Sequence, residues 1–332
     1  MTSVTGAVTA VTRPVTAVTK GENTFHGELP SHAMTPGGPI LTFYGVRGST
    51  PCDGHDYQRY GGSTSSVSLE CAGHAPVIFD LGTGVRAYGD EVSQRLLADL
   101  EANRAATPYT ANVLLTHLHW DHIIGLPFFT PAFRPDAKIN VYGPRQMEGG
   151  LGDVFAEVMR PPFFPITPDQ LGGDVNFLDV GNDAYALNGA KVLSRWVRHT
   201  DPALGFRVDL EGRSVTYISD HGPGCITDDP DDYVPPGVLE LCDGVDVLIH
   251  DAQHTLEEYE AKRHFGHSSI EYAVQVGKEA GVKNLVLFHH CPTHSDEDLD
   301  QILTHAQDLS AGIDGPQIIA SHEGMRIELD KL

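Results

Sequence analysis

The residues best suited to chemistry lie within residues 112–126, which read NVLLTHLHWDHIIGL. Four ligand-type side chains follow an apolar run there: His117, His119, Asp121 and His122. Residues i and i+2 of an extended backbone project to the same side, so His117 and His119 can converge on one cation. If the chain then turns into a helix, Asp121 and His122 can face a second cation nearby. Imidazole and carboxylate without cysteine suit Zn, Mn or Fe. The alternative, surface histidines on a loop, is disfavoured by their position directly after a buried strand.

The order of these residues, H-x-H-x-D-H, resembles the signature of the metallo-β-lactamase-fold hydrolases. Four other segments resemble the family's further motifs, in the same order along the chain. They are VIFDLGTG with Asp80, WVRHTDPALGFRV with His199, SVTYISDHG with Asp220 and NLVLFHHCP with His289. An isolated Asp or His at a strand end is more often a cap or a satisfied polar group. Their joint occurrence over residues 40–330 therefore carries the resemblance.

The resemblance implies a centre of two metal ions. One ion is held by His117, His119 and His199, and the other by Asp121, His122 and His289, with Asp220 bridging. His290 is the competing candidate for the last ligand. We favour His289 because the aligned position is the first residue beyond the strand that Phe288 ends. Asp80 is implied as a structural hydrogen-bonding carboxylate rather than a ligand.

A second set of residues resembles the ribonuclease Z and phosphodiesterase branch of the family. In residues 247–273, VLIHDAQHTLEEYEAKRHFGHSSIEYA, Asp251 and His267 match an acid pair that the branch has near its metals. A carboxylate orients an imidazole and raises its pKa, and the imidazolium can then stabilise a phosphoryl oxygen or protonate a leaving alkoxide. Alternatively, Gly-His-Ser is only a helix N-terminus capped by Ser268. The bridging Asp220 disfavours β-lactam hydrolysis, whereas thioester and lactone hydrolases of the family keep it.

Two Gly- and Ser-rich segments, FYGVRGSTP and RYGGSTSSV, fit the same branch as turns that line the metal cleft. Arg47 in the first could meet an anionic group of the substrate, although ordinary hairpin chemistry explains the glycines equally well. Ser63 stands in the second segment where the family often has Asn. Residues 160–174, RPPFFPITPDQLGGD, are rich in proline and aromatic residues. They are expected to form a lid or cleft wall, or alternatively a packed surface loop.

Charge narrows the substrate class. The 332 residues hold 22 Lys and Arg against 45 Asp and Glu, a formal net charge of −23. A field of that sign repels phosphate backbones, and the basic arm with which ribonuclease Z grips transfer RNA is not visible. Long nucleic acid is therefore disfavoured as a partner, whereas bound cations can still attract a small anion.

We therefore expect a binuclear metal-dependent hydrolase, a phosphodiesterase acting on small phosphodiesters such as cyclic nucleotides. Two divalent cations, zinc first with manganese or iron as alternatives, lower the pKa of a shared water and form a bridging hydroxide. Asp121 and Asp220 orient this hydroxide, and His267, backed by Asp251, assists the leaving oxygen. The alternatives are a lactone or thioester hydrolase on the same site, or a ribonuclease Z-like RNA endonuclease. A di-iron oxygen-reducing protein and a non-catalytic module are disfavoured.

Short β-rich runs alternate with helical patterns from Pro39 onward. The expected strands are 40–46, 66–71, 77–80, 112–116, 138–142, 175–178, 191–198, 204–210, 214–219, 245–250, 284–288, 317–320 and 325–329. The expected helices are 85–100, 146–159, 256–263, 268–280 and 295–309. Hairpin-like pairs followed by strand–helix units favour an α/β (α+β) domain of mixed sheets covered by helices. The family resemblance implies an αββα four-layer sandwich of two mixed β-sheets flanked by helices.

Residues 1–38 differ from the rest, because Val-Thr occurs five times within the first 20 residues. We expect a low-complexity flexible arm there, or alternatively a strand added to a neighbouring subunit, followed by one hydrolase domain over 39–332. The arm lacks the continuous apolar stretch of a secretory signal, and no run approaches the roughly 18 apolar residues of a membrane helix. The five cysteines form no CxxC pair, which favours a reduced, cytoplasmic compartment. A homodimer is the assembly we expect.

Overall fold

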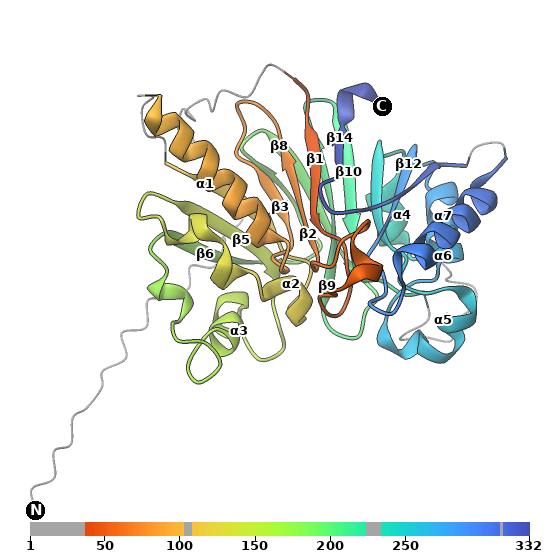
Figure 1. Cartoon of the computed structure of the whole chain (residues 1–332), viewed down its shortest axis with the longest axis horizontal. Coiled ribbons are helices and arrows are strands. Elements are labelled where there is room, and N and C mark those ends of the chain that lie inside the picture. The colour runs from red at the N-terminus through yellow and green to blue at the C-terminus, as the bar shows by residue number, and fades with distance from the viewer. Residues whose placement is uncertain (1–36, 103–107, 224–233, 313–314) are drawn as a thin grey trace, which may run out of the picture.

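The computed structural model describes residues 37–102, 108–223, 234–312 and 315–332. The predicted arm over 1–38 lies outside the described residues, apart from its last two positions. In the described part of the chain, two seven-stranded sheets pack face to face, and helices lie on both outer sides (Figure 1). The predicted αββα sandwich of two mixed sheets is therefore confirmed.

The first sheet has the order β14-β1-β2-β3-β4-β5-β6. The pairs from β14 to β3 are antiparallel and those from β3 to β6 are parallel. Its strands are β1 (Ile40–Gly45), β2 (Ser66–Glu70), β3 (Val77–Phe79), β4 (Thr110–Leu114), β5 (Lys138–Pro144), β6 (Asp174–Val180) and β14 (Arg326–Glu328).

The second sheet has the order β13-β12-β11-β10-β9-β8-β7. Here β7 to β10 are antiparallel neighbours and β10 to β13 are parallel. Its strands are β7 (Ala184–Leu187), β8 (Ala190–Val197), β9 (Ala203–Leu210), β10 (Arg213–Ile218), β11 (Val247–Asp251), β12 (Asn284–Phe288) and β13 (Gln317–Ala320). All residues of β11 and β12 are buried, as expected for parallel strands covered on both faces.

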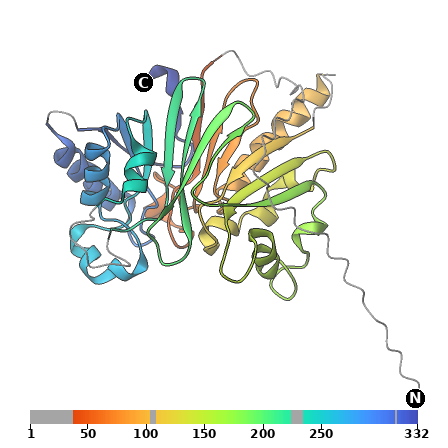
Figure 2. The ribbon, with the colours of Figure 1, turned by 180° about the vertical axis from the view of Figure 1, so that it is seen from behind.

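Three apolar clusters hold the layers together. One fills the space between the sheets, one lies under α1 and α3, and one lies under α4, α6 and α7. The view from behind shows the helices on the two outer sides of the sheets (Figure 2). The helices are α1 (Val85–Glu101), α2 (Trp120–Ile123), α3 (Leu151–Val158), α4 (Pro236–Cys242), α5 (Leu256–Lys262), α6 (Ile270–Glu279) and α7 (Asp296–Ser310). Among the described residues, no helix combines the length and apolar character that crossing a bilayer requires.

The Asp and His residues predicted to bind or surround the metals lie at the edge of each sheet where its parallel strands end. Because β10, β11 and β12 are parallel neighbours, the residues at or just beyond their carboxyl ends, Asp220, Asp251 and His289, emerge side by side. In the other sheet β3 and β4 do the same with Asp80 and His117. Strand direction thus gathers residues that are far apart in sequence.

Three elements differ from the sequence-based expectations. β7 is an edge strand of only four residues, two of them exposed, so it has no clear apolar alternation. α4 was not expected, because this short helix begins with Pro236 and Gly237, which are typical of a turn. The helix expected from Gln146 begins at Leu151, because Gly149 and Gly150 precede it and glycine disfavours helix.

Candidate metal centre

The first group of ligand-type atoms comes from His117, His119, His199 and Asp220, all within 4.8 Å of one another. His199 Nε2 lies 3.2 Å from His119 Nδ1. His117 Nε2 lies 3.8 Å from Asp220 Oδ2. β8 and β10 supply His199 and Asp220 from beyond their carboxyl ends, whereas both other residues follow β4.

The second group comes from Asp121, His122, His289 and Asp220, and all four are buried. His122 Nε2 lies 3.1 Å from both Asp121 Oδ2 and Asp220 Oδ1. His289 Nε2 lies 3.1 Å from Asp121 Oδ2. Asp220 belongs to both groups, which is the position of a carboxylate that bridges two ions. The structure thus brings together all seven residues named as metal ligands.

These atoms fit divalent cations. Ligand atoms about 2.0–2.2 Å from a tetrahedral centre lie roughly 3.4 Å apart, close to the spacings found here. His117 Nε2 and Asp220 Oδ1 are buried without a hydrogen-bond partner among the described residues, and a bound cation would satisfy both. Burial lowers the pKa of His117, which keeps it in the neutral form that binds metal. Burial raises the pKa of Asp220, but His122 and His289 more than offset this and hold it well below its usual range.

His290 lies apart from both groups. Its Nε2 donates a hydrogen bond to the Ser321 carbonyl at 2.9 Å, and its ring packs edge-on against Tyr60. His289, in contrast, has a left-handed backbone with φ 60°. Such a conformation is uncommon for a non-glycine residue and persists only where the surroundings impose it. The turn at His289 aims its ring into the second group and leaves His290 outside.

Residues outside the two ligand groups orient the imidazole rings. His199 Nδ1 donates to the Gly266 carbonyl at 2.9 Å, and His117 Nδ1 donates to Thr116 Oγ1 at 3.0 Å. Each ring therefore presents its other nitrogen to the centre. Gly266 has φ 79°, and a Cβ there would come within 2.7 Å of His199 Nδ1. Glycine is required at this turn by both conformation and space.

Asp80 is the central supporting residue. Its carboxylate accepts hydrogen bonds from His122 Nδ1 at 2.7 Å, the Thr116 amide at 2.8 Å and the Tyr217 hydroxyl at 2.9 Å. With Nδ1–H donating to Asp80, His122 has its Nε2 lone pair free for a cation. Asp80 thus takes the structural place that the sequence resemblance implied.

We predict that Asp80→Asn lowers metal affinity about 10- to 100-fold, because an amide cannot accept from His122 as a carboxylate does. Asn tolerates the left-handed backbone of this residue, φ 57°, so the fold should persist. Competition with a fluorescent chelator measures the affinity. Asp209→Asn, which changes a more exposed carboxylate paired with Arg207, is the matched control. Equal metal affinity in both variants would contradict the orienting role.

Sequence reasoning missed two residues, Ser49 and Gln253. The Ser49 amide donates to Asp121 Oδ2 at 2.8 Å, and the Gln253 side chain lies 3.2 Å from His289 Nδ1. The atom at this distance is Gln253 Nε2, which also donates to Ser49 Oγ at 3.2 Å. When His289 binds a cation through Nε2, its Nδ1 carries hydrogen, and the amide would then have to turn its oxygen toward Nδ1 to accept it. Gln253 follows Asp251 by two positions, and an i, i+2 pattern beyond the strand end could have indicated it.

Asp251 and His267 form a pair beside the second group. His267 Nδ1 donates to Asp251 Oδ2 at 2.9 Å and lies 3.6 Å from Asp220 Oδ2. Burial opposes protonation, but Asp251 and then Asp220 more than offset it, so the pKa of His267 is raised. The helix-cap alternative named Ser268, whereas the residue that caps α6 is Ser269.

Arg47 is not placed to meet a substrate. Its side chain is fully buried, and its guanidinium donates to the carbonyls of Gly61, Cys291 and His294 at 2.8–3.2 Å. An ion pair to Asp296 at 3.8 Å completes its surroundings. The expected substrate contact is therefore corrected to a structural role, in which Arg47 ties the N-terminal turn to the loop after β12.

Arg47→Met should lower the free energy of unfolding by about 2–5 kcal/mol, because it leaves buried carbonyls and a carboxylate without their donor. Urea unfolding of the metal-free protein measures this loss. Arg134→Met, which removes an exposed ion pair to Asp136, should cost less than about 1 kcal/mol. Similar losses in the two variants would argue against this structural role of Arg47.

Comparison with known proteins supports the assignment of the fold. A family model described as "Beta-lactamase superfamily domain" matches residues 77–290. Ribonuclease Z of Streptococcus suis is 29% identical over 240 residues, covering 58% of this chain and 75% of that protein. An uncharacterised protein of Mycobacterium tuberculosis is 29% identical over 272 residues, covering 76% of this chain and 82% of its own length.

A solved structure shows the same fold. Unliganded yeast PDE1 superimposes with a TM-score of 0.62 at 14% identity, covering 87% of this chain and 99% of that one. The family model spans more than half of the chain and includes all seven ligand-type residues between His117 and His289. The chain therefore belongs to the beta-lactamase superfamily, as a metal-dependent hydrolase of that fold.

Proposed function

We propose that the metal centre hydrolyses small phosphodiesters, with zinc as the first candidate for both cations. The observation that carries this proposal is the Asp251–His267 pair, which lies beside the second group: its ligand-type atoms and that of His289 are within 4.8 Å of one another. Hydrolysis of a phosphodiester needs a donor for the leaving oxygen as well as a nucleophile, and a hydrogen-bonded carboxylate–imidazole pair suits that task.

The proposed reaction assigns a separate role to the cations, to the two ligand carboxylates and to His267. Two divalent cations, when bound, supply a nucleophile at neutral pH by lowering the pKa of water and offset the charge of the phosphate. Asp121 and Asp220 would hold the cations and, through them, orient the attacking oxygen. His267 donates its Nδ1–H to Asp251, and in the imidazolium form its Nε2 carries a second proton that it can donate to the leaving oxygen. The phosphorus–oxygen bond breaks as that proton is transferred.

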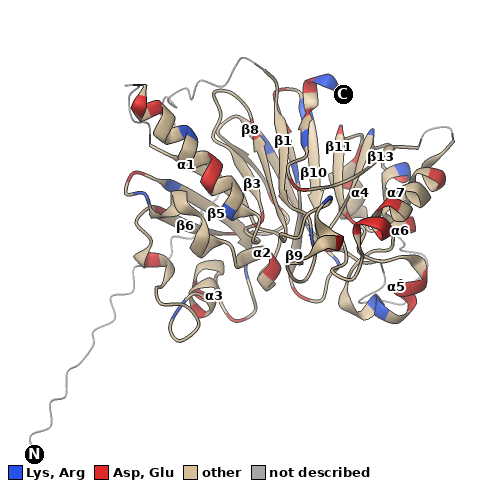
Figure 3. Ribbon diagram, in the orientation of Figure 1, with Lys and Arg blue, Asp and Glu red and all other residues tan. Residues whose placement is uncertain are grey.

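Charge supports a small substrate over RNA. Exposed carboxylates lie on α5 and α7 (Figure 3), among them Glu257, Glu260, Glu297 and Asp298. Together with a net charge of −23, they repel a long polyanion. The name of the relative ribonuclease Z says that it cleaves RNA, and the RNA backbone is itself a phosphodiester. The shared chemistry therefore supports the bond type, and the charge favours a small ester.

A substrate panel tests this proposal. Protein loaded with Zn or Mn is assayed with bis(p-nitrophenyl) phosphate, a cyclic nucleotide, a lactone, a thioester and a precursor transfer RNA. We expect cleavage of the two small phosphodiesters and its loss on adding chelator. Faster cleavage of the lactone or thioester would replace the proposed reaction with another hydrolysis on the same metals. Efficient cleavage of the precursor RNA alone would assign an endonuclease.

A further inference from the structure

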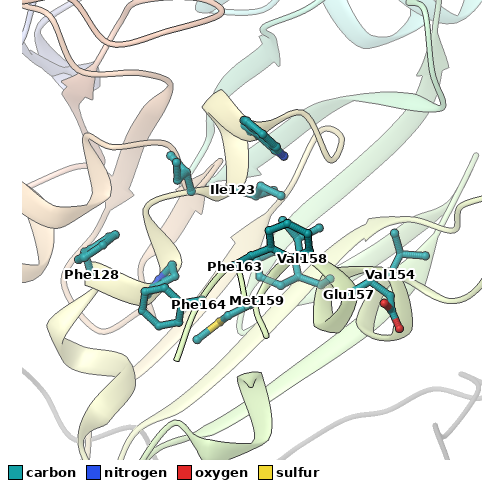
Figure 4. Close-up of a pocket in the computed structure, with 12 residues that line it drawn as sticks. Ile123, Phe128, Val154, Glu157, Val158, Met159, Phe163 and Phe164 are labelled. Atoms are coloured by element: carbon teal, nitrogen blue, oxygen red, sulfur yellow. The ribbon is translucent and has the colours of Figure 1, made fainter. Parts of the chain in front are cut away.

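A cavity of about 490 Å³ opens beside α2 and is walled mainly by apolar side chains, five of them aromatic. Its lining comes from α2 and the residues that follow α2, and from α3 and the residues that follow α3 (Figure 4). The aromatic lining residues are Trp120, Phe128, Phe155, Phe163 and Phe164. Among the described residues that line it, Glu157 alone is charged. This volume lies within the range of about 300–1,000 Å³ that is typical of small-molecule sites.

The rings of this pocket are open to solvent. Phe163 is 75% exposed, Trp120 is 71% exposed and Phe128 is 52% exposed. Large apolar side chains that stay together in water mark a binding surface. The wall is held in place, because Phe164 packs edge-on against Phe128 at 6.0 Å and its amide donates to the Arg160 carbonyl at 2.9 Å. Two residues of the Pro- and aromatic-rich segment 160–174, Phe163 and Phe164, thus belong to the wall of this pocket.

The pocket and the metal centre share the short helix α2. Trp120 stands between His119 of the first group and Asp121 of the second. Asp121 and His122 are buried on the metal side of this short helix, whereas Trp120 points outward. Trp120 therefore links the pocket to the segment that carries ligand-type residues of both groups.

We propose that this pocket binds a planar aromatic group of the phosphodiester substrate, such as a nucleobase or an aryl ring. The assignment rests on the proposed function and specifies its substrate class. Aromatic side chains favour stacking with a planar ring. Such stacking accepts any nucleobase, because every base has a π-face. The near absence of charge in the lining excludes a second phosphate as the occupant. Phe163 and Trp120 are the residues that select this group.

Binding of two phosphonates to the zinc-loaded protein tests the proposal. Phenylphosphonate and methylphosphonate carry the same anionic head, so calorimetric titration isolates the contribution of the ring. We expect phenylphosphonate to bind about tenfold more tightly or better, and Phe163→Ala to abolish that preference. Phe133→Ala, which removes a 42% exposed ring outside the lining, should retain it.

Several outcomes separate this proposal from the proposed function. Equal affinity for the two phosphonates, or a phenyl preference that survives Phe163→Ala, overturns the pocket assignment even when bis(p-nitrophenyl) phosphate is cleaved. A dimer that Phe163→Ala dissociates in sedimentation, without a phenyl preference, assigns the pocket to contact between two copies instead. No turnover of any phosphodiester overturns the proposed function, and the assignment that rests on it.

Discussion

Asp220→Asn is expected to abolish turnover and to lower the metal content of the protein to one ion or less per chain. Asp220 is the carboxylate shared by both ligand groups, and its oxygens lie 3.1 Å from His122 Nε2 and 3.8 Å from His117 Nε2. An amide offers one weak oxygen ligand in place of two charged ones, so it cannot bridge two cations. Loss of metal chemistry costs several kcal/mol of transition-state stabilisation, which corresponds to about 10³-fold or more in kcat.

The measurement is metal analysis of the purified variant together with kcat on bis(p-nitrophenyl) phosphate. His55→Ala is the control, because that imidazole is almost fully exposed and outside both groups. Melting of the metal-free proteins shows whether the fold is preserved, since the amide is nearly isosteric. A variant that keeps two ions and full activity would show that Asp220 does not bridge them.

Much of this centre could be predicted from sequence, because its ligands follow strand ends. The carboxyl ends of parallel strands must emerge at one edge of a sheet. Once β10, β11 and β12 are recognised as apolar runs, the residues just beyond them are expected to meet. The H-x-H-x-D-H segment supplies four more groups after β4. Local pattern predicted the four residues after β4, whereas the family resemblance supplied His199, Asp220 and His289, and sheet geometry explains why they meet.

The corrected residue, Arg47, shows where such reasoning fails. An arginine in a Gly- and Ser-rich turn suits a substrate contact as well as a structural one. The outcome was decided by Cys291 and His294, whose carbonyls accept from its guanidinium across more than 240 positions of sequence. Neither carbonyl has any signature in the sequence. Gln253 differs from these carbonyls, because its position two residues after Asp251 was a signal in the sequence, although its contact with His289 was not.

His267→Ala is expected to lower kcat without lowering metal content. Its ring is held by Asp251 at 2.9 Å and lies beside the second group, as a proton donor to the leaving oxygen should. Loss of a positioned acid costs about 10²- to 10⁴-fold. The loss should be large for a cyclic nucleotide, whose leaving alkoxide needs a proton, and much smaller for bis(p-nitrophenyl) phosphate, whose phenolate leaves unaided. Comparing kcat on the two esters therefore separates proton donation from general electrostatic stabilisation.

Asp251→Asn serves as the companion variant. Because Asp251 acts through His267, the double variant should be no slower than His267→Ala, whereas independent roles would make the losses multiply. An equal loss on both esters would argue against proton donation. Metal loss in His267→Ala would change the assignment of the ligands, because the ligand-type atoms of Asp251, His267 and His289 also lie within 4.8 Å of one another. His267 would then belong to the ligand set, and the leaving oxygen would need another donor.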